Sequence, residues 1–372
     1  MSLYVINVIE KMFDSNYYST KLIVRDILLK KNINFFRSKI PKRTKIIAVV
    51  KANAYGYGDI SISNKLIENG IDYLAVADFE EGIRLRSHKI NLPIMILYPS
   101  KNNLSIIVEN CLEPTIYNER MLNAIRKLQN KKIKIHIKID SGMNRYGITK
   151  EQVPLFIRKI KKSKNIIIGS IFSHLSSHKK EHHKYALNQI NYFDKIKSIF
   201  LKEFSYKIDT HILSSYGIIN FPKQSDSMVR IGFGLYNGVF NNKLNHIGEL
   251  SSQIAQIKNL NKGDSVGYNR SFIASKKMRI AVIPLGYADG LQRSWGNGKL
   301  KFLYKNKFVP VLGEISMDSC IVDVSNVNKV EEGDKLILFG NKRSIFSLAK
   351  ELETIPYEIT AGLSKRIKRI FS

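Results

Sequence analysis

The feature that most constrains the fold of this 372-residue chain is an alternation within its first 240 residues. Short apolar runs, each long enough for a buried strand, are separated by stretches whose apolar residues recur at helical spacing. Because no hairpin signal joins consecutive runs, we expect parallel strands connected through helices. The runs that we predict to be strands span residues 46–50, 73–78, 94–98, 112–117, 134–140, 167–174, 210–215 and 228–236.

Eight parallel strands alternating with helices predict a (β/α)8 barrel, which takes roughly 250 residues. Residues 238–249 are rich in Gly and Asn and break the alternation, and the later apolar runs are β-branched and separated by turn residues. We therefore predict an α/β fold with two domains. An N-terminal TIM-type barrel with a short N-terminal extension would take residues 1–240, and a C-terminal all-β domain would take residues 241–372.

Three shorter segments carry local predictions. Residues 22–33 and 345–352 have helical spacing and are expected to be helices. The apolar, β-branched residues before about position 18 are expected to form a strand or a docked tail.

Composition narrows the class of protein. The chain has 60 Lys and Arg against 31 Asp and Glu, but the basic residues are spread along its length, so we expect no specific nucleic-acid binding. Cys111 and Cys320 are far apart and lack CxxC spacing, which indicates a reducing compartment. No apolar run approaches the roughly 18 residues of a membrane span, and no signal-peptide pattern opens the chain. We expect a cytoplasmic protein that does not bind membranes.

Lys51 is the first candidate for chemistry, because it directly follows a buried apolar run in IIAVVKANAYGYG. An ammonium at the end of such a run is costly unless it is paired, deprotonated or covalently consumed. A Schiff base with pyridoxal phosphate consumes it, and the freed amine can then act as a base. The strand alone is equally compatible with a lysine whose ammonium reaches solvent at the rim.

Other candidate residues fall at the ends of predicted strands, where barrel enzymes place their active sites. One such residue would be unremarkable, but their number predicts a single site at one end of the barrel. Besides Lys51 they are Lys138, Arg145, His174, Ser215, Arg230, Gly232 and Phe233.

AVVKANAYGYG resembles the pyridoxal-lysine signature of alanine racemases, a family of fold-type III pyridoxal-phosphate enzymes. The blocks HIKIDSGMNRYG, SHLSS, MVRIGFGLYNG, SVGYNR, PLGYADG, ISMDSC and PYEI follow in the family's order, so the resemblance extends from about residue 20 to residue 369. It implies an isomerase that interconverts L- and D-alanine and provides D-alanine for the peptidoglycan cell wall.

The resemblance also implies a binding set for the cofactor, with Lys51 bonded to it and His174 packed against its ring. Arg230 would face the ring nitrogen. Because arginine keeps its proton, the ring would be a weak electron sink, which favours proton return over transamination. The groups expected to hold the phosphate are Tyr55, Ser215, the backbone amides of Gly232 and Phe233, and Tyr357.

Two bases and a carboxylate clamp are further implications of the resemblance. Lys51 would take the α-proton of the D-enantiomer and Tyr268 that of the L-enantiomer. Arg145, also beside the cofactor, and the backbone amide of Met317 would hold the substrate carboxylate. Tyr268 and Met317 would come from the partner subunit, so a homodimer with shared active sites is expected. Lys138 matches a position that is carbamylated in several family members, and a plain strand lysine is an equal alternative.

Three alternatives remain at this point. His178, Glu181 and His182 fit the HxxEH zinc-peptidase pattern, but two lysines within it oppose a dication and no distal glutamate motif accompanies it, so we predict no metal site. A non-catalytic pyridoxal-phosphate-binding barrel would share Lys51, but it would lack the C-terminal domain. A racemase of broader specificity, acting on serine or lysine, would share most of the blocks.

Overall fold

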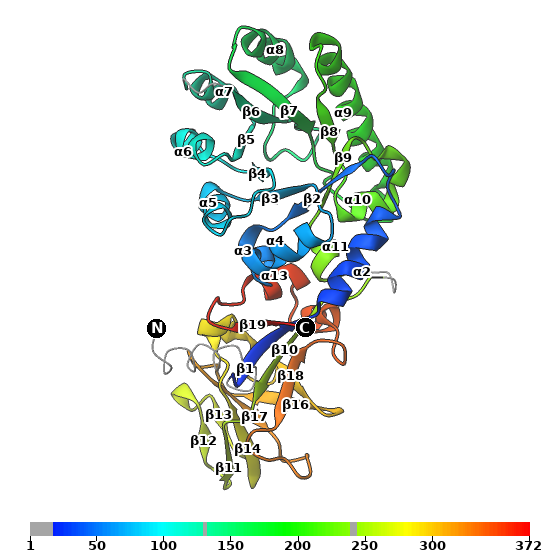
Figure 1. Cartoon of the computed structure of the whole chain (residues 1–372). Helices are drawn as coiled ribbons and strands as arrows, with labels where there is room; N and C mark the ends of the chain where they lie inside the picture. The colour runs from blue at the N-terminus through cyan, green and yellow to red at the C-terminus, as the bar shows by residue number, and fades with distance from the viewer. Residues whose placement is uncertain (1–17, 129–131, 239–243) are drawn as a thin grey trace. The chain divides into compact units, whose positions relative to one another are not determined.

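The computed structural model describes residues 18–128, 132–238 and 244–372, which form two compact units (Figure 1). We call residues 30–244 the barrel unit, and residues 18–29 together with 245–372 the β unit. The sequence analysis grouped the N-terminal extension with the barrel. The structure groups its described part with the β unit, because strand β1 (Thr20–Val24) pairs with β10 (Gly248–Gln253) and β19 (Lys368–Phe371).

The barrel unit contains an eight-stranded parallel sheet in the order β8-β7-β6-β5-β4-β3-β2-β9. The gap between β8 and β9 is bridged by Arg230 N donating to Leu213 O at 3.1 Å and Thr210 N donating to Ser227 Oγ at 2.7 Å. The prediction of a (β/α)8 architecture is therefore confirmed. The strands are β2 (Lys45–Val49), β3 (Tyr73–Val76), β4 (Ile94–Ile96), β5 (Glu113–Ile116), β6 (Ile133–Lys138), β7 (Ile166–Phe172), β8 (Asp209–His211) and β9 (Met228–Ile231).

Helices follow the strands and surround the sheet (Figure 1). Each presents an apolar face to the strands, as the spacing of its residues predicts. They are α2 (Asp26–Arg37), α3 (Lys51–Tyr55), α4 (Asp59–Glu68), α5 (Phe79–Ser87), α6 (Leu104–Glu109), α7 (Glu119–Ile125), α8 (Val153–Lys161), α9 (His183–Glu203), α10 (Ser215–Asn220) and α11 (Phe233–Tyr236).

The observed strands end earlier than the predicted ones. Strand β7 stops at Phe172, so His174 lies in the loop that follows, and Ser215 already opens helix α10. Apolar runs cannot show where ladder hydrogen bonding stops, because side chains beyond the strand end remain buried at the mouth of the barrel. Most of the candidate residues consequently lie on the loops and helix starts at the carboxyl ends of the strands, whereas Lys138 and Arg230 lie within β6 and β9. Barrel active sites occur at these carboxyl ends.

The β unit is built on a nine-stranded sheet in the order β11-β14-β17-β16-β15-β18-β10-β1-β19, with a separate β12–β13 hairpin. The expected all-β fold is observed, with the expected helix α12 (Ile345–Glu351) and a further helix, α13 (Pro356–Ala361). The remaining strands are β11 (Gln256–Leu260), β12 (Ser265–Val266), β13 (Phe272–Ile273), β14 (Met278–Ile283), β15 (Lys301–Tyr304), β16 (Lys307–Leu312), β17 (Cys320–Asp323) and β18 (Lys335–Phe339).

The helix predicted for residues 22–33 was wrong at its start. Strand β1 runs to Val24 and α2 begins only at Asp26. The hydrogen-bonding partners of β1 lie more than two hundred residues away, so its helical spacing is overridden by tertiary pairing. The predicted strand or tail before residue 18 lies outside the described residues.

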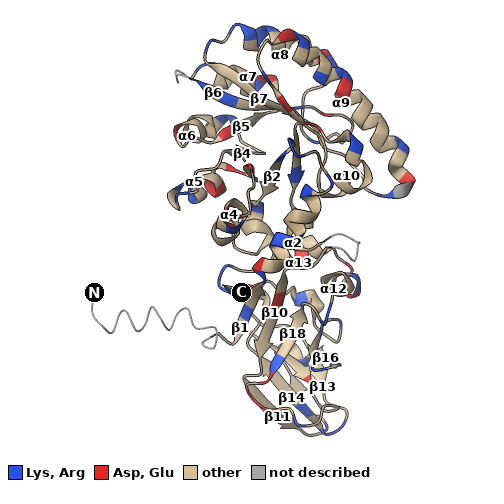
Figure 2. Cartoon of the chain, turned by 45° about the vertical axis from the view of Figure 1, so that its right-hand side comes forward, with Lys and Arg blue, Asp and Glu red and all other residues tan. Residues whose placement is uncertain are grey.

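The basic side chains are distributed over both units, as the sequence predicts. Figure 2 shows Lys and Arg on helices of the barrel unit and on strands of the β unit alike. Cys111 is exposed and Cys320 is buried, and both are free thiols. Within the described ranges, no helix is long and apolar enough to cross a membrane.

Candidate active site

Lys51 begins a left-handed turn that directly follows strand β2. Ala52, Asn53, Ala54 and Tyr55 have φ values of 52° to 55°, a region that costs non-glycine residues about 1–2 kcal/mol each. Hydrogen bonds within the turn offset part of this cost, with Ala54 N donating to Val50 O at 2.8 Å. Strain of this kind is retained where a side chain must be aimed.

Glu81 of helix α5 clamps that turn. Its Oε1 accepts a hydrogen bond from Ala52 N at 2.6 Å, and its Oε2 accepts one from Ala77 N at 2.7 Å. The carboxylate thus ties the lysine turn to the end of strand β3. The sequence analysis missed Glu81, although its place at the start of the helix after a barrel strand, in VADFEEG, was an available signal.

The Lys51 amine lies in a cationic and aromatic environment. Its Nζ lies 5.8 Å from the ring centre of Tyr98, and the Arg145 guanidinium lies 5.7 Å from the same ring. Burial and the charge of Arg145 lower the pKa of Lys51, although Glu81 opposes this shift. This shift makes the neutral amine, which can act as a nucleophile or a base, more accessible than in a free lysine. Tyr98 ends the predicted strand 94–98, but the sequence analysis gave it no role.

Arg230 on β9 is fixed by several partners. Its Nη2 donates to Ser173 O at 2.6 Å and lies 3.0 Å from Nδ1 of His174, while its Nη1 is hydrogen-bonded to Nδ1 of His211. Burial lowers the pKa of Arg230 to about 10, which leaves it charged at neutral pH. Burial of His174, together with the charge of Arg230, holds the pKa of His174 well below its usual range. A fixed cation beside a neutral imidazole can hold an aromatic heterocycle by its ring nitrogen.

Lys138 ends strand β6 inside the barrel. Its Nζ lies 4.6 Å from the ring centre of Phe172. Burial, together with the charges of Arg230 and Arg145, lowers its pKa well below the usual value. A plain ammonium is therefore disfavoured at this position, and a neutral amine is favoured.

A cradle of hydroxyl and amide groups lies where strands β8 and β9 end. Ser215 Oγ accepts hydrogen bonds from the backbone N–H groups of Gly232 and Gly234, each at 3.3 Å. A Cβ atom at Gly232 would meet the Tyr55 hydroxyl at 2.4 Å, so only glycine allows this close approach. Phe233 opens α11 directly beside these groups. Hydroxyls and amides of this kind suit a phosphate, and the residues present fit pyridoxal phosphate.

The residues expected from the C-terminal blocks lie on the β unit. Tyr268 follows β12 and is 68% exposed, and Met317 precedes β17 and is 53% exposed. Tyr357 lies in the first turn of α13. The structure therefore brings together Lys51, Arg145, His174, Ser215, Arg230 and their neighbours within the barrel unit, and it places the other three on the β unit.

The zinc-peptidase pattern is not supported by its local structure. That pattern needs both histidines on one helix, but α9 begins only at His183, and His178 stacks on Tyr216 with ring centres 4.1 Å apart. Nδ1 of His182 is hydrogen-bonded to Ser177 Oγ at 2.8 Å. The described part of the chain contains no cluster of three or more His, Cys, Asp or Glu side chains that could hold a metal ion.

A barrel that carries a lysine of lowered pKa, a buried and hydrogen-bonded arginine, and a cradle of hydroxyl and amide groups fits the class of barrel-type pyridoxal-phosphate enzymes. The family model for the alanine racemase N-terminal domain matches residues 28–239, and that for the C-terminal domain matches residues 247–371. The chain belongs to the alanine racemase family and is a pyridoxal-phosphate-dependent racemase.

Curated relatives and solved structures agree with this assignment. Alanine racemase 2 of Caldanaerobacter subterraneus subsp. tengcongensis is 35% identical over 91% of both chains, and alanine racemase of Helicobacter pylori (strain P12) is 34% identical over 92% of this chain and 96% of its own. The structure of alanine racemase from Clostridium difficile 630 matches with a TM-score of 0.88 at 31% identity, covering 95% and 96% of the two chains. Alanine racemase from Bartonella henselae, with covalently bound pyridoxal phosphate, matches with a TM-score of 0.85 at 27% identity, covering 95% and 99%.

Proposed function

We propose that the chain interconverts L- and D-alanine with two bases, Lys51 and Tyr268, and thereby provides D-alanine for cell-wall synthesis in the cytoplasm. One observation carries the proposal: the Lys51 amine has a lowered pKa and lies with Arg145 against the Tyr98 ring. An amine that removes a proton and a guanidinium that binds a carboxylate are the two groups that an amino-acid substrate requires. The curated relatives are named alanine racemases, which supports alanine as that substrate.

Pyridoxal phosphate, when bound to Lys51, supplies the electron sink that makes the α-proton of an amino acid removable. Lys51 Nζ, once released from the cofactor, would remove or return that proton on one face of the substrate carbon. Tyr268 Oη does so on the opposite face, so that a proton taken by one base is matched by a proton given by the other. Arg230, which remains charged and donates hydrogen bonds, limits the electron sink and favours proton return.

Arg145 and the backbone amide of Met317 hold the substrate carboxylate in this proposal. Tyr268 and Met317 are exposed on the β unit, which is the expected state of residues that complete a partner's site. We therefore include a homodimer with shared active sites. Ser215, Gly232, Phe233, Tyr55 and Tyr357 would hold the cofactor phosphate.

Carbamylation of Lys138 is part of the proposal. Because burial and two arginines disfavour its ammonium form, the neutral amine is available to attack carbon dioxide. The nitrogen releases one proton to solvent as its bond to carbon forms, and the resulting carbamate is an anion, which would offset the charges of Arg145 and Arg230. Growth and purification in 13C-bicarbonate, followed by 13C NMR, should show a carbamate signal that is absent from a Lys138→Ala variant.

The direct test of the proposed function is a racemisation assay on the purified chain loaded with pyridoxal phosphate. L-alanine should give equal amounts of the two enantiomers, with kcat/KM at least tenfold above the values for L-serine and L-lysine. Faster turnover of serine or lysine would replace alanine as the substrate. Cofactor binding without turnover of any of the three would favour a pyridoxal-phosphate carrier.

A further inference from the structure

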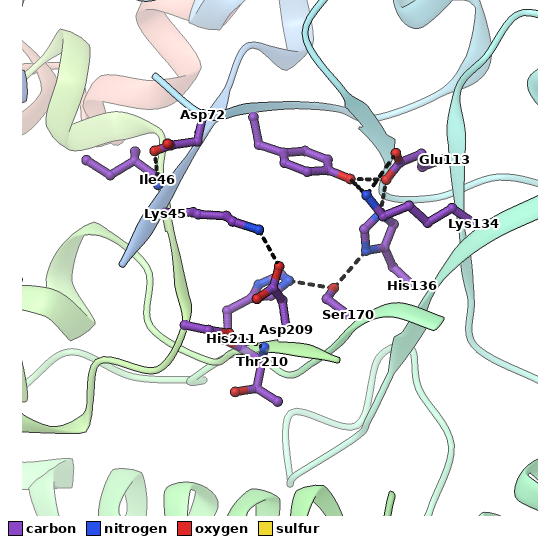
Figure 3. A network of polar contacts seen from close by, with 12 residues as sticks. Lys45, Ile46, Asp72, Glu113, Lys134, His136, Ser170, Asp209, Thr210 and His211 are labelled. Atoms are coloured by element: carbon purple, nitrogen blue, oxygen red, sulfur yellow. Dashed lines mark hydrogen bonds and ion pairs between the residues drawn. The ribbon is translucent and has the colours of Figure 1, made fainter. Parts of the chain in front are cut away.

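Five polar side chains inside the barrel form one continuous chain of hydrogen bonds. Each comes from a different strand, and the strands follow one another in sequence from β5 to β9. Figure 3 shows the first four side chains, and the sequence analysis gave a role only to the fifth. In order they are Glu113, His136, Ser170, His211 and Arg230.

The hydrogen bonds that join these five side chains are short, and most of the groups are buried. His136 Nε2 lies 2.8 Å from Glu113 Oε2, and His136 Nδ1 lies 2.7 Å from Ser170 Oγ. Ser170 Oγ lies 2.9 Å from His211 Nε2, and His211 Nδ1 is hydrogen-bonded to Arg230 Nη1. His136, Ser170, His211 and Arg230 are each at most 4% exposed. Water therefore has little access to replace any link.

The two ends of the chain determine the direction of every hydrogen bond in it. A guanidinium can only donate, so Arg230 donates to His211 Nδ1, and the proton of neutral His211 lies on Nε2. That N–H donates to Ser170 Oγ, whose hydroxyl donates to His136 Nδ1. His136 then donates from Nε2 to Glu113, because a carboxylate can only accept.

Glu113 is suited to end the chain as an anion. Burial raises its pKa, but the hydrogen bonds from His136 and Tyr73 and the charge of Lys134 lower it below the usual value. Lys134 Nζ lies 3.3 Å from Glu113 Oε1 and donates to Tyr73 Oη at 3.0 Å. The carboxylate at the amino-terminal end of β5 is thus held in its ionised form.

We propose that Glu113, His136 and Ser170 are positioning residues for Arg230, because their one-way hydrogen bonds leave His211 Nδ1 as a bare acceptor that orients the guanidinium. A proton on His211 Nδ1 would face the N–H of Arg230, and the two donors would force the guanidinium to turn. Three further contacts of the guanidinium involve Nη2, to Ser173 O, His174 Nδ1 and Ile212 O. Nη1 has, besides His211 Nδ1, a long contact of 3.4 Å to His211 O, so the chain of hydrogen bonds supplies the short bond that orients Nη1. The inference rests on the proposed function in assigning Arg230 to the cofactor ring.

A matched control lies at the same end of the barrel. Asp209 pairs with Lys45 at 2.7 Å, and its side chain is 13% exposed, against 15% for Glu113. Figure 3 shows this pair beside the chain, but Asp209 contributes no hydrogen bond to it. Replacing Asp209 by Asn therefore removes a comparable ion pair without interrupting the links to Arg230.

The first experiment determines the tautomers of His136 and His211 directly and does not depend on catalytic activity. 15N NMR of the full chain, labelled at histidine and loaded with pyridoxal phosphate, should show His136 and His211 as neutral imidazoles protonated on Nε2. Assignment would come from His136→Asn and His211→Asn variants. A proton on Nδ1 of His211, or a doubly protonated His136, would overturn the inference. This result stands even where the racemisation assay fails, so the two proposals are tested separately.

The second experiment interrupts the chain. Ser170→Ala removes the central hydroxyl without changing charge, and we expect kcat to fall by about tenfold, the lower end for losing a residue that orients a ligand. KM for alanine should stay within twofold. Ser170→Thr, which keeps the hydroxyl, should restore kcat. Glu113→Gln provides a second test should Ser170→Ala fail to fold, because its amide can donate as well as accept and so no longer fixes the direction of the hydrogen bonds. Equal kcat values for Glu113→Gln and Asp209→Asn, or an unchanged kcat in a folded Ser170→Ala chain, would leave these residues only a structural role.

Discussion

The barrel unit and the β unit hold their site residues in opposite ways. In the barrel unit, Arg230 is 4% exposed and hydrogen-bonded to His174, His211 and three backbone carbonyls. In the β unit, Tyr268 and Met317 are 68% and 53% exposed.

This difference shows how the buried residues of the barrel unit acquire their reactivity and why the exposed residues of the β unit do not acquire it in the same way. Burial and charge inside the barrel shift the pKa values of Lys51, Lys138 and His174, so these groups are prepared before any substrate arrives. An exposed side chain gains no comparable preparation from its own unit. Substitutions in the barrel unit should therefore disturb folding and cofactor binding as well as activity, whereas substitutions at the exposed residues of the β unit should disturb activity alone.

The largest expected effect is that of Lys51→Ala. Because the proposal assigns both the cofactor bond and one catalytic base to the Lys51 amine, which lies with Arg145 at the Tyr98 ring, we expect racemisation to fall to background and the visible absorption of the bound cofactor to disappear. Activity and absorption spectra of the purified variant are the measurements. Lys101→Ala, at an exposed lysine of the same unit, is the control and should match the unsubstituted chain. Retained absorption in Lys51→Ala would place the cofactor on another lysine.

The second prediction concerns the β unit. Tyr268→Phe should lower kcat by roughly 10²- to 10⁴-fold, the usual cost of losing a general acid–base group. Because the side chain is exposed, the free energy of unfolding should change by less than about 0.5 kcal/mol. Denaturant titration and absorption spectra should show an intact fold and a bound cofactor.

Mixing the two variants tests whether the site is shared. Lys51→Ala and Tyr268→Phe chains, each inactive alone, should regain activity when refolded together, because one site of a mixed dimer would contain both bases. No recovery in a sample with demonstrated mixed dimers would indicate a site built within one chain.

The third prediction returns to the barrel unit. Glu81→Ala leaves the part-buried amide of Ala77 without its carboxylate, which costs about 1–3 kcal/mol, whereas water can replace the carboxylate at the exposed amide of Ala52. We expect the free energy of unfolding to fall by about 1–3 kcal/mol, with weaker cofactor binding, because the strained lysine turn loses its support. Urea denaturation and cofactor titration measure the two effects. Glu80→Ala, at the exposed neighbouring carboxylate, should leave both unchanged.

The smallest effect is the pH dependence of stability. His174 and His211 have pKa values held well below 6.5 by burial and by Arg230, so below pH 6.5 the unfolded chain binds protons that the folded chain excludes. The free energy of unfolding of the barrel unit should therefore fall by about 2 kcal/mol between pH 7 and pH 5.5. His211→Asn should roughly halve the slope.

Comparison with the β unit sharpens that measurement. The one histidine of the described β unit, His246, has its pKa lowered to about 4 by burial, so the loss of stability of this unit over the same pH range should be about half as large. Trp295, the single tryptophan, lies buried in the β unit and reports its unfolding by fluorescence. Circular dichroism follows the helices of the barrel unit. Equal pH slopes for the two signals would contradict the assignment of these histidines.

The sequence by itself determined the alternation of strands and helices, the change to a β-rich pattern near residue 240 and the blocks that carry the family resemblance. Apolar spacing and turn residues act locally, and they are enough to predict eight parallel strands and a β-rich second part. Lys51, His174, Ser215 and Arg230 could be named because each lies at the end of a strand run.

Tertiary structure alone decided which polar groups meet. The pairing of β1 with β10 and β19 overrode a helical spacing, since its hydrogen-bonding partners are distant in sequence. Glu81 and His211 gave no signal of function in their own segments, because a carboxylate in a first helical turn and a histidine inside a strand are ordinary locally. Closing the sheet into a barrel set Glu81 on the lysine turn and His211 on Arg230, and only that three-dimensional proximity gives them their chemistry.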